Sequence, residues 1–182
     1  LLLALVTTAT VVAQQPGYDD PDAFAIYSTL LGNGYSVIRN TTKTFPAFGE
    51  GQSCLIAPKN LQPILNPLIK AYRDENKTPR LLTGKLSGVG GYQFVSEELL
   101  RQRFFSQDID EGWDKFHKAF PTSGGIDEVS AVGFNSDRSI ALVYYGHTCG
   151  GLCGSGRFYV FERKGDKWTK SKLPFSPCEW IS

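Results

Sequence analysis

The sequence contains no methionine and, apart from His117 and His147, no histidine. No run of more than two basic residues occurs in its 182 residues, and the formal net charge is +1. Because nucleic-acid binding requires clustered Lys and Arg, we expect no nucleic-acid partner. Without a start methionine, we expect the sequence to belong to a longer precursor.

The low histidine content also argues against catalysis by a nucleophile relay. Such a relay places a histidine beside its Ser or Cys, and no Gly-x-Ser-x-Gly motif is present either. The neighbouring carboxylates Asp108, Asp110 and Glu111 fit the acidic first turn of a helix better than a catalytic pair. We therefore expect no catalytic residues and no cofactor, with a hydrolase of unrecognised site as an alternative.

No segment is apolar over the roughly 20 residues that a membrane-spanning helix needs. The stretch Leu1–Ala13 is uncharged and apolar, and its last residues fit the small-x-small pattern of signal cleavage before Gln14. This predicts a signal peptide over residues 1–13, a secreted or periplasmic protein, and no membrane span after signal removal. A buried N-terminal helix or strand is the alternative.

Residues 14–182 are predicted to form a single α+β domain, because 41% of the chain is hydrophobic. The part 14–127 is expected to be mainly helical with one or two short strands, one of them at Tyr35–Arg39. The apolar spacing across Leu61–Asn76 is helical, but Pro63 and Pro67 leave open one kinked helix or two pieces. The other helices expected are Ala23–Leu31 capped by Asp19 or Asp22, one from Ser96 through Phe105, and one from Asp108 or Asp110 to Phe120.

The part 128–175 is predicted to be an antiparallel sheet. Turn residues at Asn135–Arg138 and Lys164–Lys167 separate strand-like segments, and the middle two segments are apolar on both faces. Strands of that kind lie inside a sheet that is covered on both sides. We therefore predict N-terminal helices packed on a C-terminal four-stranded antiparallel β-meander, with strands at Glu128–Asn135, Ser139–Thr148, Arg157–Arg163 and Trp168–Leu173.

The segment between the middle two strands combines two cysteines, several glycines and a histidine. It is the candidate binding loop, and it could be a disulfide-pinned turn, a redox dithiol or a soft-metal site with His147, Cys149 and Cys153 as ligands. We favour the structural disulfide and expect no metal, because an exported pair of this kind usually oxidises. The loop residues singled out are His147, Gly150, Gly151, Gly154, Ser155 and Gly156.

The chain has four cysteines, which allow three disulfide pairings. Flexible glycines between Cys149 and Cys153 allow the short loop to close. We favour this pair together with a long link between Cys54 and Cys178. In the chain-entropy model the long link contributes up to ~5 kcal/mol and the short one only ~2 kcal/mol.

Several segments resemble one family of exported bacterial proteins. The chain is similar to that uncharacterised family at Val132–Asn135, Ala141–Tyr144, Cys149–Gly154, Tyr159–Glu162, Lys164–Trp168, Ala25–Ser28, Val37–Thr42 and Gly112–Phe116. The resemblance implies export and one fold unit, and it implies no chemistry because the family has no assigned activity. Cys54 and Cys178 lie outside its pattern, which leaves Cys149 and Cys153 as each other's partners.

These observations predict an exported, non-catalytic binding or accessory protein. Its partner is an unknown protein, peptide or glycan ligand, bound wherever aromatic side chains line an uncovered face of the sheet. The alternative is a thiol-redox or metal-handling protein that uses His147, Cys149 and Cys153.

Overall fold

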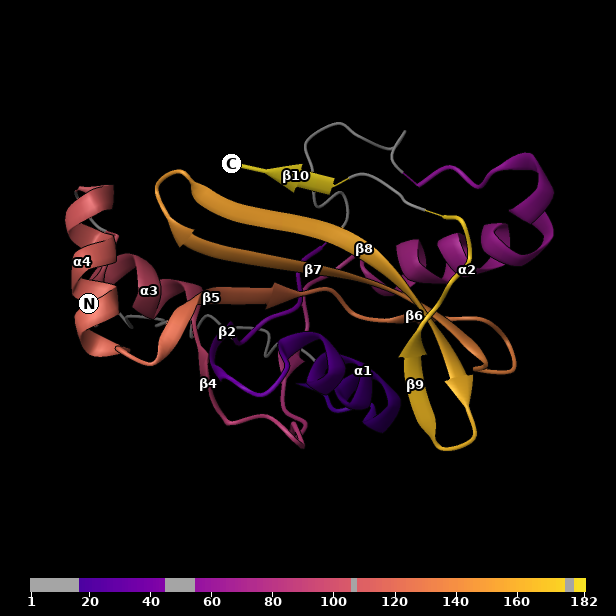
Figure 1. The fold of residues 1–182 in the computed structure, drawn as a ribbon, viewed down its shortest axis with the longest axis horizontal. Coiled ribbons are helices and arrows are strands. Elements are labelled where there is room, and N and C mark those ends of the chain that lie inside the picture. Colours follow the sequence, from indigo (N-terminus) through magenta and orange to yellow (C-terminus); the bar gives the residue numbers. More distant parts are fainter. Residues whose placement is uncertain (1–16, 45–54, 106–107, 176–178) are drawn as a thin grey trace, which may run out of the picture.

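The computed structural model describes residues 17–44, 55–105, 108–175 and 179–182. Its helices are α1 (Pro21–Leu31), α2 (Gln62–Glu75), α3 (Glu97–Arg103) and α4 (Ile109–Ala119), with a 3₁₀ turn at Lys59–Leu61 before α2. Its strands are β1 (Gly17–Tyr18), β2 (Tyr35–Arg39), β3 (Leu81–Leu82), β4 (Gly91–Val95), β5 (Ser123–Val129), β6 (Gly133–Phe134), β7 (Ile140–Gly150), β8 (Cys153–Lys164), β9 (Lys167–Lys170) and β10 (Glu179–Ile181) (Figure 1). The signal peptide expected at residues 1–13 lies outside the described residues.

The main sheet has eight strands and is mixed, so the predicted four-stranded antiparallel meander is wrong. The strand order is β10-β8-β7-β5-β2-β4, with β6 added to β7 and β9 added to β8. Strands from the part 14–127, expected to be mainly helical, join the same sheet, because β2 pairs in parallel with both β4 and β5. Parallel pairing joins segments far apart in the chain, which local strand patterns do not reveal.

The strand predicted at Glu128–Asn135 is two strands. β5 begins earlier, at Ser123, and ends at Val129, and β6 follows at Gly133. Both pair antiparallel with β7. The interruption between them brings Ala131 and Val132 beneath α2 and beside Tyr18, which positions one wall of the cavity described below.

Helix α1 has Asp20 as its N-cap, one position after Asp19 and two positions before Asp22. The side chain of Asp20 accepts the backbone N–H groups of Asp22 at 3.0 Å and Ala23 at 3.2 Å, so the cap is neither Asp19 nor Asp22. Helix α2 is continuous and contains both prolines. Pro63 lies in its first turn, and Pro67 is exposed, so the carbonyl left without a helical partner faces solvent.

The caps predicted for the next two helices are confirmed. The Ser96 hydroxyl accepts the N–H of Leu99 at 3.1 Å, and the Asp108 carboxylate accepts the N–H of Glu111 at 2.9 Å. Helix α4 ends just before Phe120 and Pro121, as expected.

Both faces of the β7–β8 pair are covered by helices (Figure 1). Ala141 and Val143 pack with α1 on one face, and Leu142 and Tyr144 pack with α2 on the other. The expectation that these strands lie inside a covered sheet is therefore confirmed. Helices α3 and α4 cover the opposite end of the α2 face, through a cluster that includes Val37 and Ile126.

A buried asparagine joins α2 to the sheet. Asn76, the C-cap of α2, donates to the carbonyls of Tyr72 at 2.8 Å and Ala131 at 2.9 Å. Its side-chain oxygen accepts the N–H of Ala131 at 2.8 Å. All of these groups are buried, so their bonds fix the end of α2 against the segment between β5 and β6.

Candidate functional site

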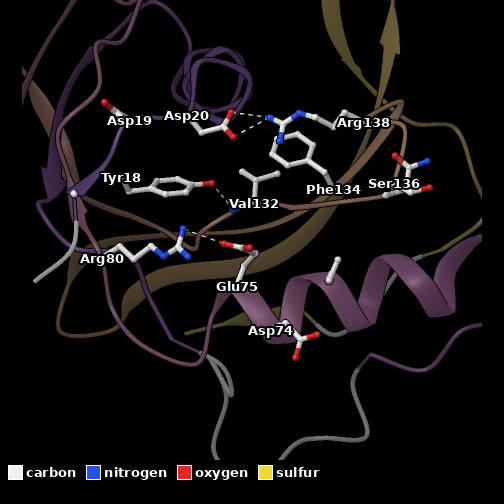
Figure 2. Close-up of a pocket in the computed structure, with 13 residues that line it drawn as sticks. Tyr18, Asp19, Asp20, Asp74, Glu75, Arg80, Val132, Phe134, Ser136 and Arg138 are labelled. Carbon is white, nitrogen blue, oxygen red and sulfur yellow. Dashed lines mark hydrogen bonds and ion pairs between the residues drawn. The ribbon is translucent and has the colours of Figure 1, made fainter.

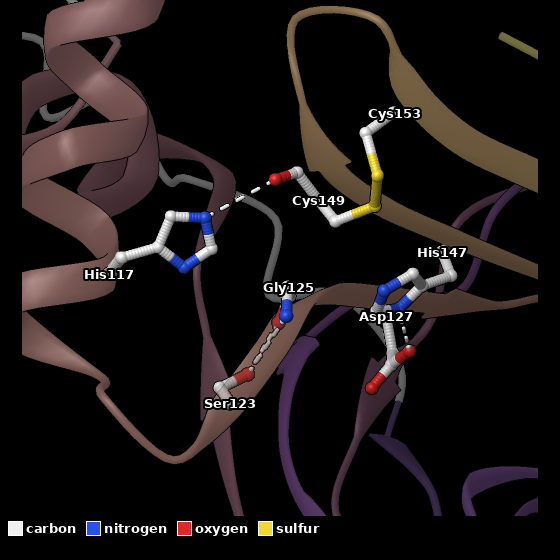
Figure 3. The surroundings of a disulfide bond; sticks show 7 residues. All are labelled: His117, Ser123, Gly125, Asp127, His147, Cys149 and Cys153. Atoms are coloured by element: carbon white, nitrogen blue, oxygen red, sulfur yellow. Dashed lines mark hydrogen bonds and ion pairs between the residues drawn. A yellow bond between two sulfur atoms is a disulfide. The ribbon is translucent and has the colours of Figure 1, made fainter.

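The candidate binding loop is the turn of the β7–β8 hairpin (Figure 3). Cys149 and Cys153 are joined there by a disulfide, with their Cα atoms 5.1 Å apart. This agrees with the pairing expected from the sequence. The second predicted disulfide, between Cys54 and Cys178, lies outside the described residues. The Nε2 atom of His117, on α4, lies 3.2 Å from the carbonyl oxygen of Cys149, which ties the turn to that helix.

His147 contacts a carboxylate on the next strand. Its Nδ1 lies 2.8 Å from Oδ1 of Asp127, and the Tyr145 hydroxyl donates to the same oxygen at 2.7 Å. The bond to Asp127 raises the pKa of His147 against the opposing effect of burial, and a bond to the carbonyl of Gly124 raises it further. The imidazole therefore links β7 to β5 through its Nδ1.

The structure does not assemble the alternative metal site from the residues that it describes. The sulfurs of Cys149 and Cys153 are bonded to each other and offer no thiolate. Of the three predicted ligands only His147 remains, and its Nδ1 is bonded to Asp127. Within the described residues, no group of three or more His, Cys, Asp or Glu side chains could hold a metal ion.

Two glycines of the predicted loop make room for an aromatic side chain. A Cβ on Gly154 would lie 2.9 Å from the Trp180 ring, and one on Gly156 would lie 2.3 Å from Trp180 Nε1. The indole donates to the Tyr144 hydroxyl at 3.1 Å. The remaining loop positions, Gly150, Gly151 and Ser155, lie at or near the surface. The glycine content of this hairpin is thus explained in part by packing against β10.

A second candidate site is a cavity that lies elsewhere, between the start of α1, the end of α2 and the turn that joins β6 to β7 (Figure 2). Its volume is about 750 Å³, within the range of small-molecule sites. Charged and aromatic side chains dominate its lining. The residues that line it are Gly17, Tyr18, Asp19, Asp20, Ala71, Asp74, Glu75, Arg80, Val132, Phe134, Asn135, Ser136 and Arg138.

Arg138 occupies one wall and is held in place by its neighbours. Its Nη2 donates to both carboxylate oxygens of Asp20 at 2.8 Å, and its guanidinium lies 3.8 Å from the centroid of the Phe134 ring. Burial opposes the charge, but the bonds to Asp20 and Asp22 raise the pKa of Arg138. The backbone φ of Arg138 is +54°, in the left-handed region that favours glycine.

Arg80 repeats this arrangement on the other side. Its Nη1 lies 2.9 Å from Oε2 of Glu75, and its guanidinium lies 5.4 Å from the centroid of the Tyr18 ring. The Tyr18 hydroxyl accepts the N–H of Val132 at 3.0 Å, and burial raises the pKa of Tyr18 to about 12. Figure 2 shows the Arg138–Asp20 and Arg80–Glu75 pairs on either side of Tyr18 and Val132.

A second cavity of about 510 Å³ adjoins the first. Both are lined by Ala71 and by the segment from Phe134 to Ser136. The residues found only in the second lining are apolar: Pro63, Ile64, Pro67 and Ile140. A charged compartment therefore continues into an apolar one along one side of α2.

No protein-family model, no curated protein and no solved structure matches this chain. The family resemblance, and the export that it implies, thus stay predictions. Among the residues that the structure describes, no helix has both the length and the apolar character needed to cross a bilayer.

Sequence reasoning missed the cavity entirely. Its lining comes from separate segments: the start of α1, the last turn of α2, Arg80, and the stretch from Val132 to Arg138. One signal was present, because the turn Asn135–Arg138 ends in an arginine where a left-handed residue is usually glycine or asparagine. The partners of Arg138 were not visible, since Asp20 lies more than a hundred residues earlier in the chain.

Proposed function

We propose that this protein is a non-catalytic binding protein that holds a small charged organic ligand in the cavity between α1, α2 and the β6–β7 turn. The proposal includes the secreted or periplasmic location expected from the sequence. The observation that carries it is the pair of guanidinium groups, Arg80 and Arg138, each bonded to a carboxylate and stacked on an aromatic ring.

Such an arrangement reduces the cost of binding. A free arginine side chain loses about 0.5–1.5 kcal/mol of conformational freedom when a ligand immobilises it. Arg138 is already held by Asp20, Asp22 and Phe134, and Arg80 is held by Glu75 and Tyr18. The guanidinium groups are therefore oriented before a ligand arrives, which favours recognition of a charged group by hydrogen bonds of fixed geometry.

The left-handed backbone of Arg138 also supports a binding function for this cavity. A residue with a Cβ atom costs roughly 1–2 kcal/mol in that conformation, and glycine avoids the cost. The turn nevertheless presents an arginine, whose guanidinium lines the cavity. Backbone strain of this kind is concentrated at functional sites, where the surrounding contacts compensate for it.

A second candidate function is protein contact through the hairpin turn. Leu152 lies between the disulfide-linked cysteines and has 90% of its surface exposed. The exposed leucine on a turn that the disulfide holds in place is the observation that favours this candidate.

The proposal can be tested with isotope-labelled protein and a panel of small probes. Glutarate, putrescine, glycyl-leucine and glucose represent the anionic, cationic, zwitterionic and neutral classes. We expect at least one probe to shift the amide signals of Tyr18, Val132 and Arg138 in a saturable manner. Arg80→Ala should weaken that binding, whereas Lys164→Ala, in the exposed β8–β9 turn, should leave it unchanged.

Either of two results would contradict the proposal. One is the absence of any saturable shift at the cavity with every probe class. The other is binding that Arg80→Ala and Lys164→Ala affect equally.

A further inference from the structure

Each wall of the cavity presents groups of both charge signs. Arg138 lies with Asp20 on one side, and Arg80 lies with Glu75 on the other. The exposed Asp19, which precedes Asp20 in the chain, also lines the cavity. From the proposed binding function and the bonds still open on these groups, we infer that the ligand is a zwitterion. Its class is a free amino acid or short peptide with an apolar side chain.

The carboxylate of the ligand would bind to Arg138. Asp20 is largely occupied, because its Oδ1 accepts the N–H groups of Asp22 and Ala23 and a bond from Nη2 of Arg138, and its Oδ2 accepts a second bond from Nη2. Its main role is therefore to orient Arg138, although Oδ2 keeps one lone pair that can accept a further bond. Nε of Arg138 donates to Asp22 at 3.1 Å, while no described residue accepts a bond from its Nη1. Nη1 of the guanidinium is therefore open to an incoming carboxylate.

The ammonium group of the ligand would bind to carboxylates of the cavity that still have an open oxygen. Oε2 of Glu75 is paired with Arg80, and no described residue donates to its Oε1. Asp19 forms no ion pair with any described residue, although it lines the cavity. Asp74 differs, because Lys70 and Lys77 bind it at 2.6 and 2.7 Å, and the bond to Lys70 is the main cause that lowers its pKa to about 2. The acceptors with an entire oxygen atom left open for an ammonium group are thus Asp19 and Glu75.

The balance of charge selects between ligand classes. A dianion bound to the arginines would share the cavity with the carboxylates of Asp19 and Glu75, and a dication bound to those carboxylates would share it with Arg80 and Arg138. Like charges that share one cavity repel each other. A zwitterion pairs each of its ends with an opposite charge and meets neither penalty.

The adjoining cavity indicates that the ligand carries an apolar side chain. Ile64 has 42% of its surface exposed there, and Pro63, Pro67 and Ile140 complete a wall without charge. A side chain such as leucine that reaches past Phe134 would cover these surfaces and remove them from water. A zwitterionic head in the first cavity and an apolar side chain in the second would make use of both compartments.

Calorimetry with leucyl-leucine and its blocked forms tests the inference. The free dipeptide should bind, and both N-acetylation and C-terminal amidation should weaken it by about tenfold, because each removes one charged end. Asp19→Asn should weaken the free dipeptide and leave the N-acetylated form unchanged. Asp166→Asn, on the exposed β8–β9 turn, is the matched control.

The apolar part has its own matched pair. Leucyl-leucine should bind better than glycyl-glycine, and Ile64→Ser should reduce that difference. Leu99→Ser is the control, because Leu99 on α3 is 40% exposed and lines neither cavity. An Ile64→Ser variant with the full preference for leucyl-leucine would overturn this part.

Failure of the inference can be told apart from failure of the proposed function. If a blocked dipeptide, glutarate or putrescine binds the cavity as tightly as free leucyl-leucine, the zwitterion inference is overturned and the binding function stands. If none of these probes binds the cavity, both are overturned.

Discussion

Nη2 of Arg138 donates to both carboxylate oxygens of Asp20 at 2.8 Å. Asp20 is also the N-cap of α1, so a single carboxylate holds the start of a helix and the end of the β6–β7 turn. Two walls of the cavity are therefore joined through one side chain. This relationship makes the backbone conformation of Arg138 a sensitive point for stability as well as for binding.

Two substitutions of Arg138 should separate the free-energy cost of its left-handed backbone from the stabilisation that its side chain provides. Arg138→Ala and Arg138→Gly both remove the ion pair and the stacking on Phe134, but glycine adopts a φ of +54° without strain. We expect the alanine variant to be less stable than the glycine variant by about 1 kcal/mol, as measured by urea unfolding. Equal stabilities would show that the left-handed conformation carries no cost at this turn.

The His147–Asp127 contact should make stability depend on pH. The pKa of His147 is raised in the folded state, mainly by its bond to Asp127. The resulting stabilisation is complete below the unfolded pKa of about 6.5, and it is lost as the pH rises through the folded value. The free energy of unfolding, relative to a His147→Gln variant, should therefore decrease as the pH is raised above about 6.5.

Urea unfolding of the two proteins across this pH range measures that difference. An NMR titration of the His147 ring in an Asp127→Asn variant provides the control, because removal of the carboxylate should lower the pKa. A stability difference that is constant, or that grows with pH, would contradict the conclusion that the bond between His147 and Asp127 stabilises the fold.

Loss of the hairpin disulfide should weaken the fold modestly and leave the cavity intact. The double variant Cys149→Ser and Cys153→Ser removes a loop constraint worth about 2 kcal/mol in the chain-entropy model. The β7–β8 turn lies at the far end of the sheet from β6 (Figure 1), so binding at the cavity should not change. Urea unfolding and the probe titrations measure the two effects.

A thiol count on native material addresses the redox alternative. If Cys149 and Cys153 are reduced in the native protein, or if they hold a metal, a chemical role for the loop replaces the structural one. Loss of cavity binding in the double serine variant would show that the two ends of the sheet are coupled.

Gly154 should tolerate a methyl group only when Trp180 is removed. Gly154→Ala places a Cβ 2.9 Å from the Trp180 ring, and such overpacking costs about 1–3 kcal/mol. In a Trp180→Ala background the same substitution should cost less. Gly34→Ala, where no atom lies within 4 Å of the added Cβ, is the neutral control. An unchanged cost in the Trp180→Ala background would exclude the tryptophan as the reason for a glycine here.

Interactions between residues close in the chain were predictable from the sequence. The Ser96 and Asp108 caps, the strand Tyr35–Arg39 and the approach of Cys149 to Cys153 each depend on residues a few positions apart. Local geometry restricts such contacts to very few alternatives, so a pattern of residue types is enough to identify them.

The tertiary structure alone decided the sheet order and the cavity. Nothing in the short strands β2 and β4 specifies that they lie side by side in parallel and next to β5, because many pairings bury such segments equally well. The contacts of Arg138 with Asp20 and of Arg80 with Glu75 exist only after the sheet and α2 have brought these segments together. The charges were present in the sequence, and the fold determined which of them meet.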